Sequence, residues 1–381
     1  MSEKIVVMHF VSGLVSGGVE QMLVNYCSYM DKDEFEFIVV YQHDPIKVCI
    51  EKIENAGCKT FRVTSKEKNP VKNLFESYKL IRKYKPHIIH SHMNLMNFFP
   101  MFVGYICGAK IRISHSHIAE KNKSFYYSIF ANFCKMLIIM FSNEFFACGH
   151  EAGEYLYGKK RMQKDKITII NNAINLDEYA PDEKHRKLVR EDLGVSNNFV
   201  IGHVGRFTEQ KNHKRLIEIF NDVVKIREDA VLLLVGTGEL ENNIKELGNQ
   251  LNLNSKIKFI GTISKMVPMY RAMDIFVLPS LFEGLPVVSL EAQAAGLRCI
   301  FSDTVAHTAK ITDLVEFVPL TQNNSLWVDR MLSPNDNKTT YYKEALTNAG
   351  YDILVESKKL SDLYKKLVDI RGRYGAKNKK R

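Results

Sequence analysis

Short, continuous apolar runs alternate with amphipathic stretches along most of the chain, and this alternation constrains the fold more than any other feature. The apolar runs are residues 4–11, 35–41, 60–63, 87–92, 111–117, 144–148, 167–170, 199–204, 231–235, 257–260, 275–279 and 299–302. Between them, apolar residues such as Met22, Tyr26 and Met30 recur at helical spacing. Continuous apolar strands separated by helices are typical of parallel sheets buried on both faces, so the sequence predicts the α/β class.

The alternation runs twice, which predicts two domains for a chain of 381 residues. A polar, charged interval at residues 175–196 lacks a sustained apolar stripe, and we expect the domain boundary there. We therefore expect a Rossmann-like, doubly wound domain at residues 1–180 and a second one at residues 197–356. Residues 357–381 form a C-terminal helix and basic tail that we expect to pack back toward the first domain. Such sheets bind ligands at the carboxyl ends of their strands, so a facing pair makes a cleft.

The charge balance limits the partners that the chain can have. Lys and Arg number 53 against 43 Asp and Glu, a net charge of +10. This excess leaves nucleic acid, an anionic membrane surface and a phosphate-bearing small molecule open. The cations are spread among acidic residues rather than clustered with stacking aromatics, which argues against nucleic acid.

The cysteines and the start of the chain predict where the protein works. Seven cysteines are scattered without a CxxC pair, which is typical of a reducing compartment. The opening MSEKIVVMHFV enters a strand-like run and lacks the apolar region of a secretory signal. We therefore expect a cytoplasmic protein.

The most apolar window, residues 125–141, is slightly short for a bilayer span and carries Asn132 and Lys135 in its middle. Two interpretations fit it: a core helix of the first domain, or a helix lying in the membrane interface. The cations that flank it are Lys121, Lys123, Lys159, Lys160 and Arg161. They leave open a peripheral contact with an anionic membrane on the cytoplasmic face.

Gly17 and Gly18 join the first predicted strand to the first predicted helix. Paired glycines let a ligand approach the backbone, and free N–H groups at a helix start suit an anion. The segment matches neither a dinucleotide fingerprint nor a P-loop, so a plain tight turn fits equally well.

In the second half, Gly205-Arg206 ends a strand, and Lys211 precedes the next helix. Both cations are therefore expected at the mouth of the second sheet. Arginine can grip a phosphate with two hydrogen bonds, and lysine adds a point charge. Two ordinary surface cations are the alternative.

A second loop of the same half, PSLFEGLP at 279–286, carries Glu283 and leads into a predicted helix that contains Glu291. The amides of Gly284 and Leu285 can meet phosphate or sugar oxygens. Glu291 stands among apolar residues, so its carboxylate needs a partner if it is buried.

Two histidine pairs close neighbouring predicted strands: His90 with His92, and His115 with His117. Residues two apart on a strand face the same way. A metal site is one interpretation, although no cysteine or carboxylate completes the spacing. Buried, hydrogen-bonded histidines are the other, with His117 at the strand end as the one that touches substrate.

Taken together and in this order, these features resemble the family-4 retaining glycosyltransferases of the GT-B fold, in which two Rossmann-like domains face each other across a cleft. The most specific stretches are GHVGRFTEQKNH (202–213) and PSLFEGLPVVSLEAQAAG (279–296). GGVE (17–20) and RISHSH (112–117) match bacterial members that build capsular polysaccharide and exopolysaccharide. Many relatives carry a Gly-Gly-x-Pro-Glu segment where this chain has SDTVAHTAKITD (302–313).

The resemblance implies a hexosyltransferase that moves a sugar from a UDP-linked donor to a hydroxyl of a glycan or lipid-diphosphate-linked acceptor. It implies retention of the anomeric configuration, with no cofactor and no metal. Catalytic roles fall on His117, Arg206, Lys211 and Glu283, and donor contacts on Gly17, Gly18, Gly205, Gly236, Gly284, Leu285, Val287 and Glu291. A nucleotide-sugar epimerase of the same architecture and a non-catalytic scaffold partner of another transferase are the alternatives.

Overall fold

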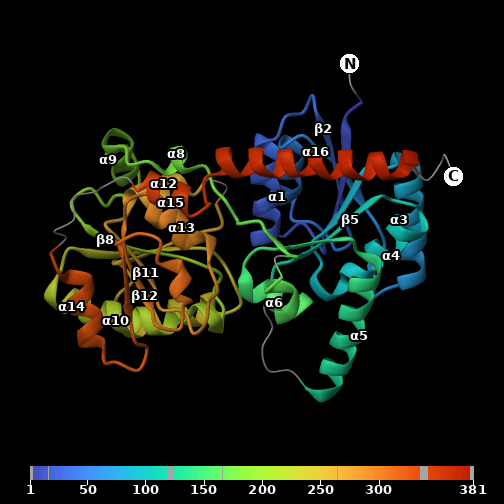
Figure 1. Cartoon of the computed structure of the whole chain (residues 1–381). Coiled ribbons are helices and arrows are strands. Elements are labelled where there is room, and N and C mark those ends of the chain that lie inside the picture. Colours follow the sequence, from blue (N-terminus) through green and yellow to red (C-terminus); the bar gives the residue numbers. More distant parts are fainter. Residues whose placement is uncertain are drawn as a thin grey trace. The chain divides into compact units, whose positions relative to one another are not determined.

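The computed structural model describes residues 3–15, 17–118, 124–164, 166–263, 265–334 and 342–377, with side chains up to Arg371. The chain divides into two compact units (Figure 1). The first unit is Met1–Ala173 with Ile353–Arg381, and the second is Ile174–Asp352. Each unit is described by itself below.

The first unit contains a parallel sheet with the strand order β3-β2-β1-β4-β5-β6-β7. Its strands are β1 (Ile5–Phe10), β2 (Phe35–Tyr41), β3 (Cys58–Arg62), β4 (Ile88–Ser91), β5 (Ile111–Ser116), β6 (Glu144–Ala147) and β7 (Thr168–Ile169). Its helices are α1 (Gly18–Tyr29), α2 (Lys47–Asn55), α3 (Pro70–Tyr84), η1 (Asn94–Asn97), α4 (Phe98–Ile106), α5 (Phe125–Phe141), α6 (His150–Tyr157), α7 (Lys159–Met162) and α16 (Ile353–Lys377).

Apolar residues cover both faces of this sheet. On one face, Tyr26 of α1 and Tyr364 of α16 pack with strand residues such as Phe37. On the other, Ile81 of α3 and Met101 of α4 pack with the alternate strand residues. Because both faces are buried, the central strands β1 and β2 are mostly apolar along their whole length.

The second unit contains a parallel sheet with the order β10-β9-β8-β11-β12-β13. Its strands are β8 (Phe199–Val204), β9 (Ala230–Val235), β10 (Ile257–Gly261), β11 (Ile275–Leu278), β12 (Arg298–Ser302) and β13 (Val315–Val318). Its helices are α8 (Leu176–Tyr179), α9 (Glu183–Asp192), η2 (Glu209–Lys211), α10 (His213–Ile226), α11 (Glu241–Gln250), α12 (Val267–Ala272), α13 (Val287–Ala294), η3 (His307–Ala309), α14 (Asn324–Leu332) and α15 (Lys343–Asn348). Two parallel sheets with helices confirm the predicted α/β class.

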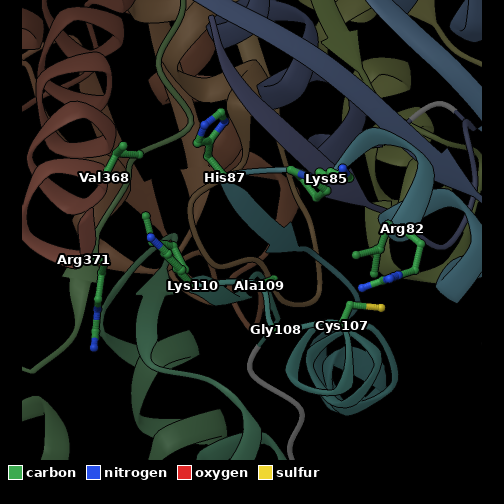
Figure 2. Close-up of a pocket in the computed structure, with 12 residues that line it drawn as sticks. Arg82, Lys85, His87, Cys107, Gly108, Ala109, Lys110, Val368 and Arg371 are labelled. Atoms are coloured by element: carbon green, nitrogen blue, oxygen red, sulfur yellow. The ribbon is translucent and has the colours of Figure 1, made fainter. Parts of the chain in front are cut away.

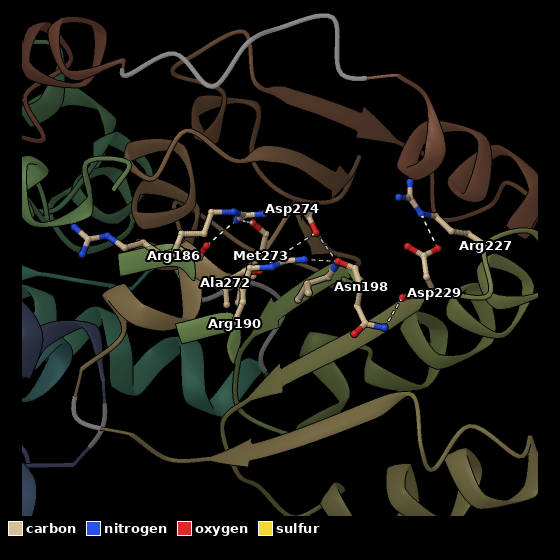
Figure 3. A network of polar contacts seen from close by, with 10 residues as sticks. Arg186, Arg190, Asn198, Arg227, Asp229, Ala272, Met273 and Asp274 are labelled. Carbon is tan, nitrogen blue, oxygen red and sulfur yellow. Dashed lines mark hydrogen bonds and ion pairs between the residues drawn. The ribbon is translucent and has the colours of Figure 1, made fainter. Parts of the chain in front are cut away.

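Residues 175–196, where we expected the boundary, belong to the second unit, which begins at Ile174. Arg186 and Arg190 of α9 both pair with Asp274, at 2.5 and 3.1 Å (Figure 3). They also donate to main-chain oxygens of the segment before β11. A polar network thus holds α9 in place of an apolar stripe, which explains why the boundary lies earlier than the sequence pattern suggests.

Helix α5 is not a core helix along most of its length. It buries Ala131, Cys134 and Ile138, which lie on one side. Its exposed apolar side chains are Phe125, Tyr126, Ile129, Phe130, Phe133, Met136 and Met140. Among the helices that the structure describes, none is long and apolar enough to cross a membrane. Lys121 and Lys123 lie outside the described residues.

Candidate functional site

Two loops of the second unit meet at the carboxyl edge of its sheet. They follow β8 and β11, which are neighbouring parallel strands, so both loops leave the sheet on the same side. The main-chain N–H of Leu281 donates to the carbonyl of Gln210 at 2.8 Å, and the Gln210 amide donates back to Phe282 at 3.0 Å. Asn212 donates to the carbonyl of Pro279 at 3.0 Å. These bonds hold the two loops as one structure.

The structure brings the predicted residues Lys211 and Glu283 together across these loops. Nζ of Lys211 lies 2.6 Å from Oε1 of Glu283, and their side chains are only 16% and 10% exposed. The Arg206 side chain, in contrast, is exposed, and none of the ion pairs between described residues involves it. The site thus holds one shielded ion pair and one cation open to a ligand.

At two of the predicted positions, Gly205 and Gly236, the added Cβ of another residue would meet neighbouring atoms. A Cβ atom at Gly205 would lie 3.1 Å from Cδ of Lys211, so the glycine lets this side chain lie against the backbone. Gly236 has φ +134, and its Cβ would lie 2.2 Å from the carbonyl oxygen of Gly205. Only glycine suits that position. At Gly284 a Cβ would have no atom within 4 Å, so packing does not require glycine there.

Glu291 is buried and has partners, as the sequence required of it. It is 8% exposed on α13, and it accepts hydrogen bonds from the hydroxyls of Tyr179 at 2.8 Å and Tyr270 at 2.7 Å. Burial and the Glu291 charge hold the pKa of both tyrosines well above the usual value, so they stay donors. The sequence indicated that donors were needed but did not identify these two tyrosines.

The start of α13 offers main-chain donors to the same edge. The helix begins at Val287, directly after Pro286 and Leu285. The first N–H groups of a helix have no helical partner. Such groups suit an anion, which is the role that the sequence suggested for this loop.

In the first unit, Gly17 precedes α1, and Gly18 is its first residue. Oε2 of Glu20 lies 2.7 Å from the position that a Cβ at Gly17 would take. Burial raises the pKa of the Glu20 carboxyl above its usual value. The helix start that we expected to receive an anion therefore already faces a carboxylate from its own first turn.

His117 lies in a cluster of imidazoles at the carboxyl ends of three adjacent strands. His9 lies on β1 opposite His90 on β4, His92 follows β4, and His115 and His117 lie on and after β5. The sequence pattern did not point to His9, because no partner stands near it along the chain. Burial lowers the pKa of His117 and of His9 to about 3. Both rings are therefore neutral at physiological pH.

Two triplets within this cluster meet a distance criterion for a metal. They are His9, His90 and His92, and His92, His115 and His117, each with ligand nitrogens within 4.8 Å of one another. Neither triplet contains a carboxylate or thiolate that would offset the charge of a divalent ion. Each triplet already contains a hydrogen-bonded pair of rings, His9 with His92 at 3.0 Å and His92 with His117 at 2.9 Å.

Two neighbouring cavities open beside the cluster in the first unit. One, of about 400 Å³, is lined by Glu20, His92 and mostly apolar side chains, including Phe130. The other, of about 340 Å³, shares Phe130 and contains Lys66. Nζ of Lys66 lies 4.9 Å from the centre of the Phe99 ring, and burial lowers its pKa to about 7. Lys66 was not singled out in the sequence, because its setting is created by residues distant in the chain.

A further cavity of about 490 Å³ lies at the opposite edge of the first sheet (Figure 2). Lys85 and His87, which precede β4, and Lys110, which precedes β5, line it. Parallel sheets bind ligands at their carboxyl edge, whereas this cavity lies at the amino ends. Its cations include Arg82 in the last turn of α3, where the helix dipole favours positive charge.

Family comparisons cover both units. Residues 16–178 match the family described as Glycosyltransferase Family 4, and residues 185–318 match Glycosyl transferases group 1. The chain is 32% identical to the putative glycosyltransferase EpsF of Bacillus subtilis over 361 residues, which is 91% of this chain and 92% of EpsF.

Two further proteins are similar over most of their length. A UDP-Gal:alpha-D-GlcNAc-diphosphoundecaprenol alpha-1,3-galactosyltransferase of Escherichia coli is 27% identical over 78% of this chain and 80% of its own. The crystal structure of Anabaena HepE in complex with UDP has a TM-score of 0.78 with 16% identity, covering 96% of this chain and all of HepE. The second likeness is one of fold.

Proposed function

The chain belongs to the family-4 glycosyltransferases, and from that premise we propose that it moves a hexose from a UDP-sugar to a hydroxyl of a glycan or lipid-diphosphate-linked acceptor, with retention. We propose surface polysaccharide synthesis in bacteria as its setting. The names of the Escherichia coli galactosyltransferase and of the HepE–UDP complex support a UDP donor. The carrying observation is the shielded Lys211–Glu283 pair, with the exposed Arg206 in the same loop after β8 as Lys211.

Arg206 and Lys211 hold the donor diphosphate in this proposal. As the bond to the sugar breaks, negative charge grows on the leaving diphosphate, and cations fixed beforehand stabilise that charge. Arg206 is exposed and accessible to a phosphate, which it can grip with two hydrogen bonds. With this charge supplied by side chains, the reaction as proposed uses neither a metal nor a cofactor.

Glu283 holds Lys211 in place before the donor arrives. The pair is largely shielded from water, so Lys211 has one preferred position at the carboxyl edge. When the diphosphate binds, it shares Lys211 with Glu283, whose carboxylate then contacts a hydroxyl of the transferred sugar. The amides of Gly284, Leu285 and Val287 add donors to the same group.

In this proposal, Glu291 binds the nucleoside of the donor. Among the described residues, each of its two oxygens accepts a tyrosine hydroxyl. A carboxylate oxygen can accept more than one hydrogen bond, so a ribose hydroxyl can bind beside the tyrosines. Gly205 lets the Lys211 side chain lie against the backbone, and Gly236 lets its own backbone lie close to the carbonyl oxygen of Gly205. His117 contacts the transferred sugar.

The transfer step balances without an external base. The bond between the anomeric carbon and the diphosphate oxygen breaks, and its electrons stay on the diphosphate. The acceptor hydroxyl oxygen bonds to the anomeric carbon on the same face, and its proton passes to the departing phosphate oxygen. The configuration is therefore retained.

The acceptor binds the first unit in this proposal. The two cavities beside Met93 are mostly apolar and contain Lys66, which suits an acceptor with a lipid-linked phosphate. The exposed apolar side chains of α5, with Lys159 and Lys160 nearby in sequence, suit the interface of an anionic membrane. All seven cysteines are free thiols, which supports a cytoplasmic location.

The test uses purified protein and a panel of nucleotide sugars. We expect one UDP-sugar to raise the unfolding temperature, and radiolabelled sugar to pass to a lipid-diphosphate acceptor.

R206A and K211A should each lower transfer about 10²–10³-fold, as loss of one charge-stabilising group does. Lys225→Ala is the control, since Lys225 also forms a 2.7 Å ion pair, but on the surface of α10. Near-normal transfer by R206A and K211A would contradict the proposal. Release of an epimerised free sugar without acceptor would indicate an epimerase instead.

A further inference from the structure

Five buried or partly buried imidazoles form two separate hydrogen-bonded strings in the first unit. In the first string, Nδ1 of His9 lies 3.0 Å from Nε2 of His92, and Nδ1 of His92 lies 2.9 Å from Nε2 of His117. In the second string, Nε2 of His90 lies 3.1 Å from Nδ1 of His115. Only the first string reaches His117.

The far end of the first string determines where its protons lie. Nε2 of His9 is buried, and no described residue offers it a hydrogen bond. A buried N–H without an acceptor is rarer in proteins than a bare acceptor, so the single proton of neutral His9 belongs on Nδ1. His9 therefore donates to Nε2 of His92.

The same argument assigns the ring protons of His92 and His117. His92 accepts at Nε2, so its proton is on Nδ1 and is donated to Nε2 of His117. His117 accepts at Nε2, so its own proton must be on Nδ1. No hydrogen bond joins Nδ1 of His117 to any residue in the described part of the chain. Burial keeps all three rings neutral, because it lowers the pKa of His92 as well as those of His9 and His117.

We propose that His9 and His92 are positioning residues that hold His117 in the neutral tautomer with the proton on Nδ1, so that His117 presents an N–H donor rather than a bare nitrogen. The functional half of this inference rests on the proposed function, in which His117 contacts the transferred sugar. A sugar hydroxyl oxygen then accepts from Nδ1–H of His117. The ring works as a neutral donor and carries no positive charge toward the sugar.

The second string provides a matched control. Nε2 of His115 is likewise buried and unpartnered among the described residues, and Nδ1 of His90 lies 2.7 Å from the hydroxyl of Tyr364 on α16. His90 stands two residues from His92, is equally buried and belongs to a string of the same kind. It has no hydrogen bond to His117.

Substitutions at His92 can separate donation from packing. The amide nitrogen of asparagine takes roughly the place of Nδ1, so His92→Asn keeps a donor for Nε2 of His117. His92→Asp places an acceptor there and should reverse the tautomer or charge the ring. His92→Leu offers neither, and the folding of each variant is checked by its thermal unfolding.

The experiment labels the histidines with 15N and reads the ring protonation from long-range 1H–15N spectra, with His117 assigned through the His117→Asn variant. We expect Nδ1-protonated His117 in the native protein, in H92N and in His90→Asn, and the opposite tautomer or a charged ring in H92D. An Nε2-protonated His117 in the native protein would overturn the inference. So would a stoichiometric metal in the purified protein whose removal by chelator shifts these resonances.

Transfer kinetics test the functional half separately. We expect H92L to lower kcat about tenfold, the effect of one lost hydrogen bond, with the donor KM nearly unchanged, and H92N to restore most of it. Equal kinetics of H92L and the native protein would overturn the coupling to the sugar. If the native protein transfers no sugar, the proposed function fails, while the spectra still decide the tautomer.

Discussion

Nζ of Lys211 lies 2.6 Å from Oε1 of Glu283, and this ion pair joins the loops after two neighbouring strands, β8 and β11. Seventy-two residues separate the partners along the chain, yet parallel pairing brings their loops to one edge of the sheet. The hydrogen bonds between Gln210 and the loop of Leu281 keep that arrangement before any ligand binds. A diphosphate that binds there must share or displace the Glu283 carboxylate.

Glu283→Gln should separate two effects of the carboxylate: stabilising the fold through its ion pair with Lys211, and competing with a diphosphate for Lys211. Removing the charge leaves the shielded Lys211 ammonium without its counter-ion, so the free energy of unfolding should fall by about 1–3 kcal/mol. UDP alone should then stabilise the variant more than it stabilises the native protein, because no carboxylate competes for Lys211. The unfolding temperature with and without UDP measures this. A smaller UDP effect in the variant would show that Glu283 does not compete with the diphosphate.

Gly236→Ala should destabilise the second unit strongly. Its φ of +134 is unfavourable for alanine, and the new Cβ would lie 2.2 Å from a main-chain oxygen that cannot move freely. We expect a loss of about 2–4 kcal/mol in urea unfolding, or failure to fold. Gly284→Ala is the control, since its Cβ would meet open space and should cost under about 1 kcal/mol. Equal stability of the two variants would contradict the role of Gly236.

Lys66 should make stability depend on pH in a definite direction. Its folded pKa is about 7, below its ordinary value of 10.5, because the charged form is buried. Between these values the unfolded chain binds a proton that the folded chain does not, so this contribution to stability rises with pH and is lost as pH falls toward 7. The slope is at most about 1.4 kcal/mol per pH unit.

Urea unfolding from pH 7 to 10 measures this contribution as the difference in the free energy of unfolding between the native protein and Lys66→Met. We expect the difference in the free energy of unfolding to narrow as pH rises, since the unfolded native chain gives up the extra proton that it binds at Lys66. Lys225→Met, at an exposed lysine, should leave the slope unchanged. Parallel curves for the native protein and Lys66→Met would mean that Lys66 keeps an ordinary pKa.

Phe133→Ser with Met136→Ser should weaken binding to vesicles of anionic phospholipid. Both side chains are exposed on α5, at 54% and 49%, and each would add apolar area to the lipid interface. We expect the partition coefficient to fall about tenfold or more, as measured by co-sedimentation. Ile226→Ser removes an apolar side chain that is 70% exposed elsewhere and serves as the control. An unchanged partition coefficient would show that these side chains of α5 do not contribute to membrane binding.

The sequence correctly predicted the features that depend on residues close together along the chain. The apolar runs predicted most strands, and their order placed Arg206, Lys211 and Glu283 after strands, where functional loops belong. It missed β13, because the run Val315–Val318 is short and contains a glutamate. It also placed the boundary too late, since α9 is held by arginines paired with Asp274 rather than by apolar contacts.

By itself, the sequence determined the α/β class, the two parallel sheets and the edge at which the chemical groups stand, because strand and helix periodicity is a property of neighbouring residues. Only the tertiary structure decided which of those groups touch. Strand order brings β1 beside β4 and so adds His9 to the histidine string, and packing of α13 against α8 and α12 gives Glu291 its two tyrosines. Such contacts join residues 21 to 112 positions apart, and no local pattern encodes which distant side chain completes a buried polar group.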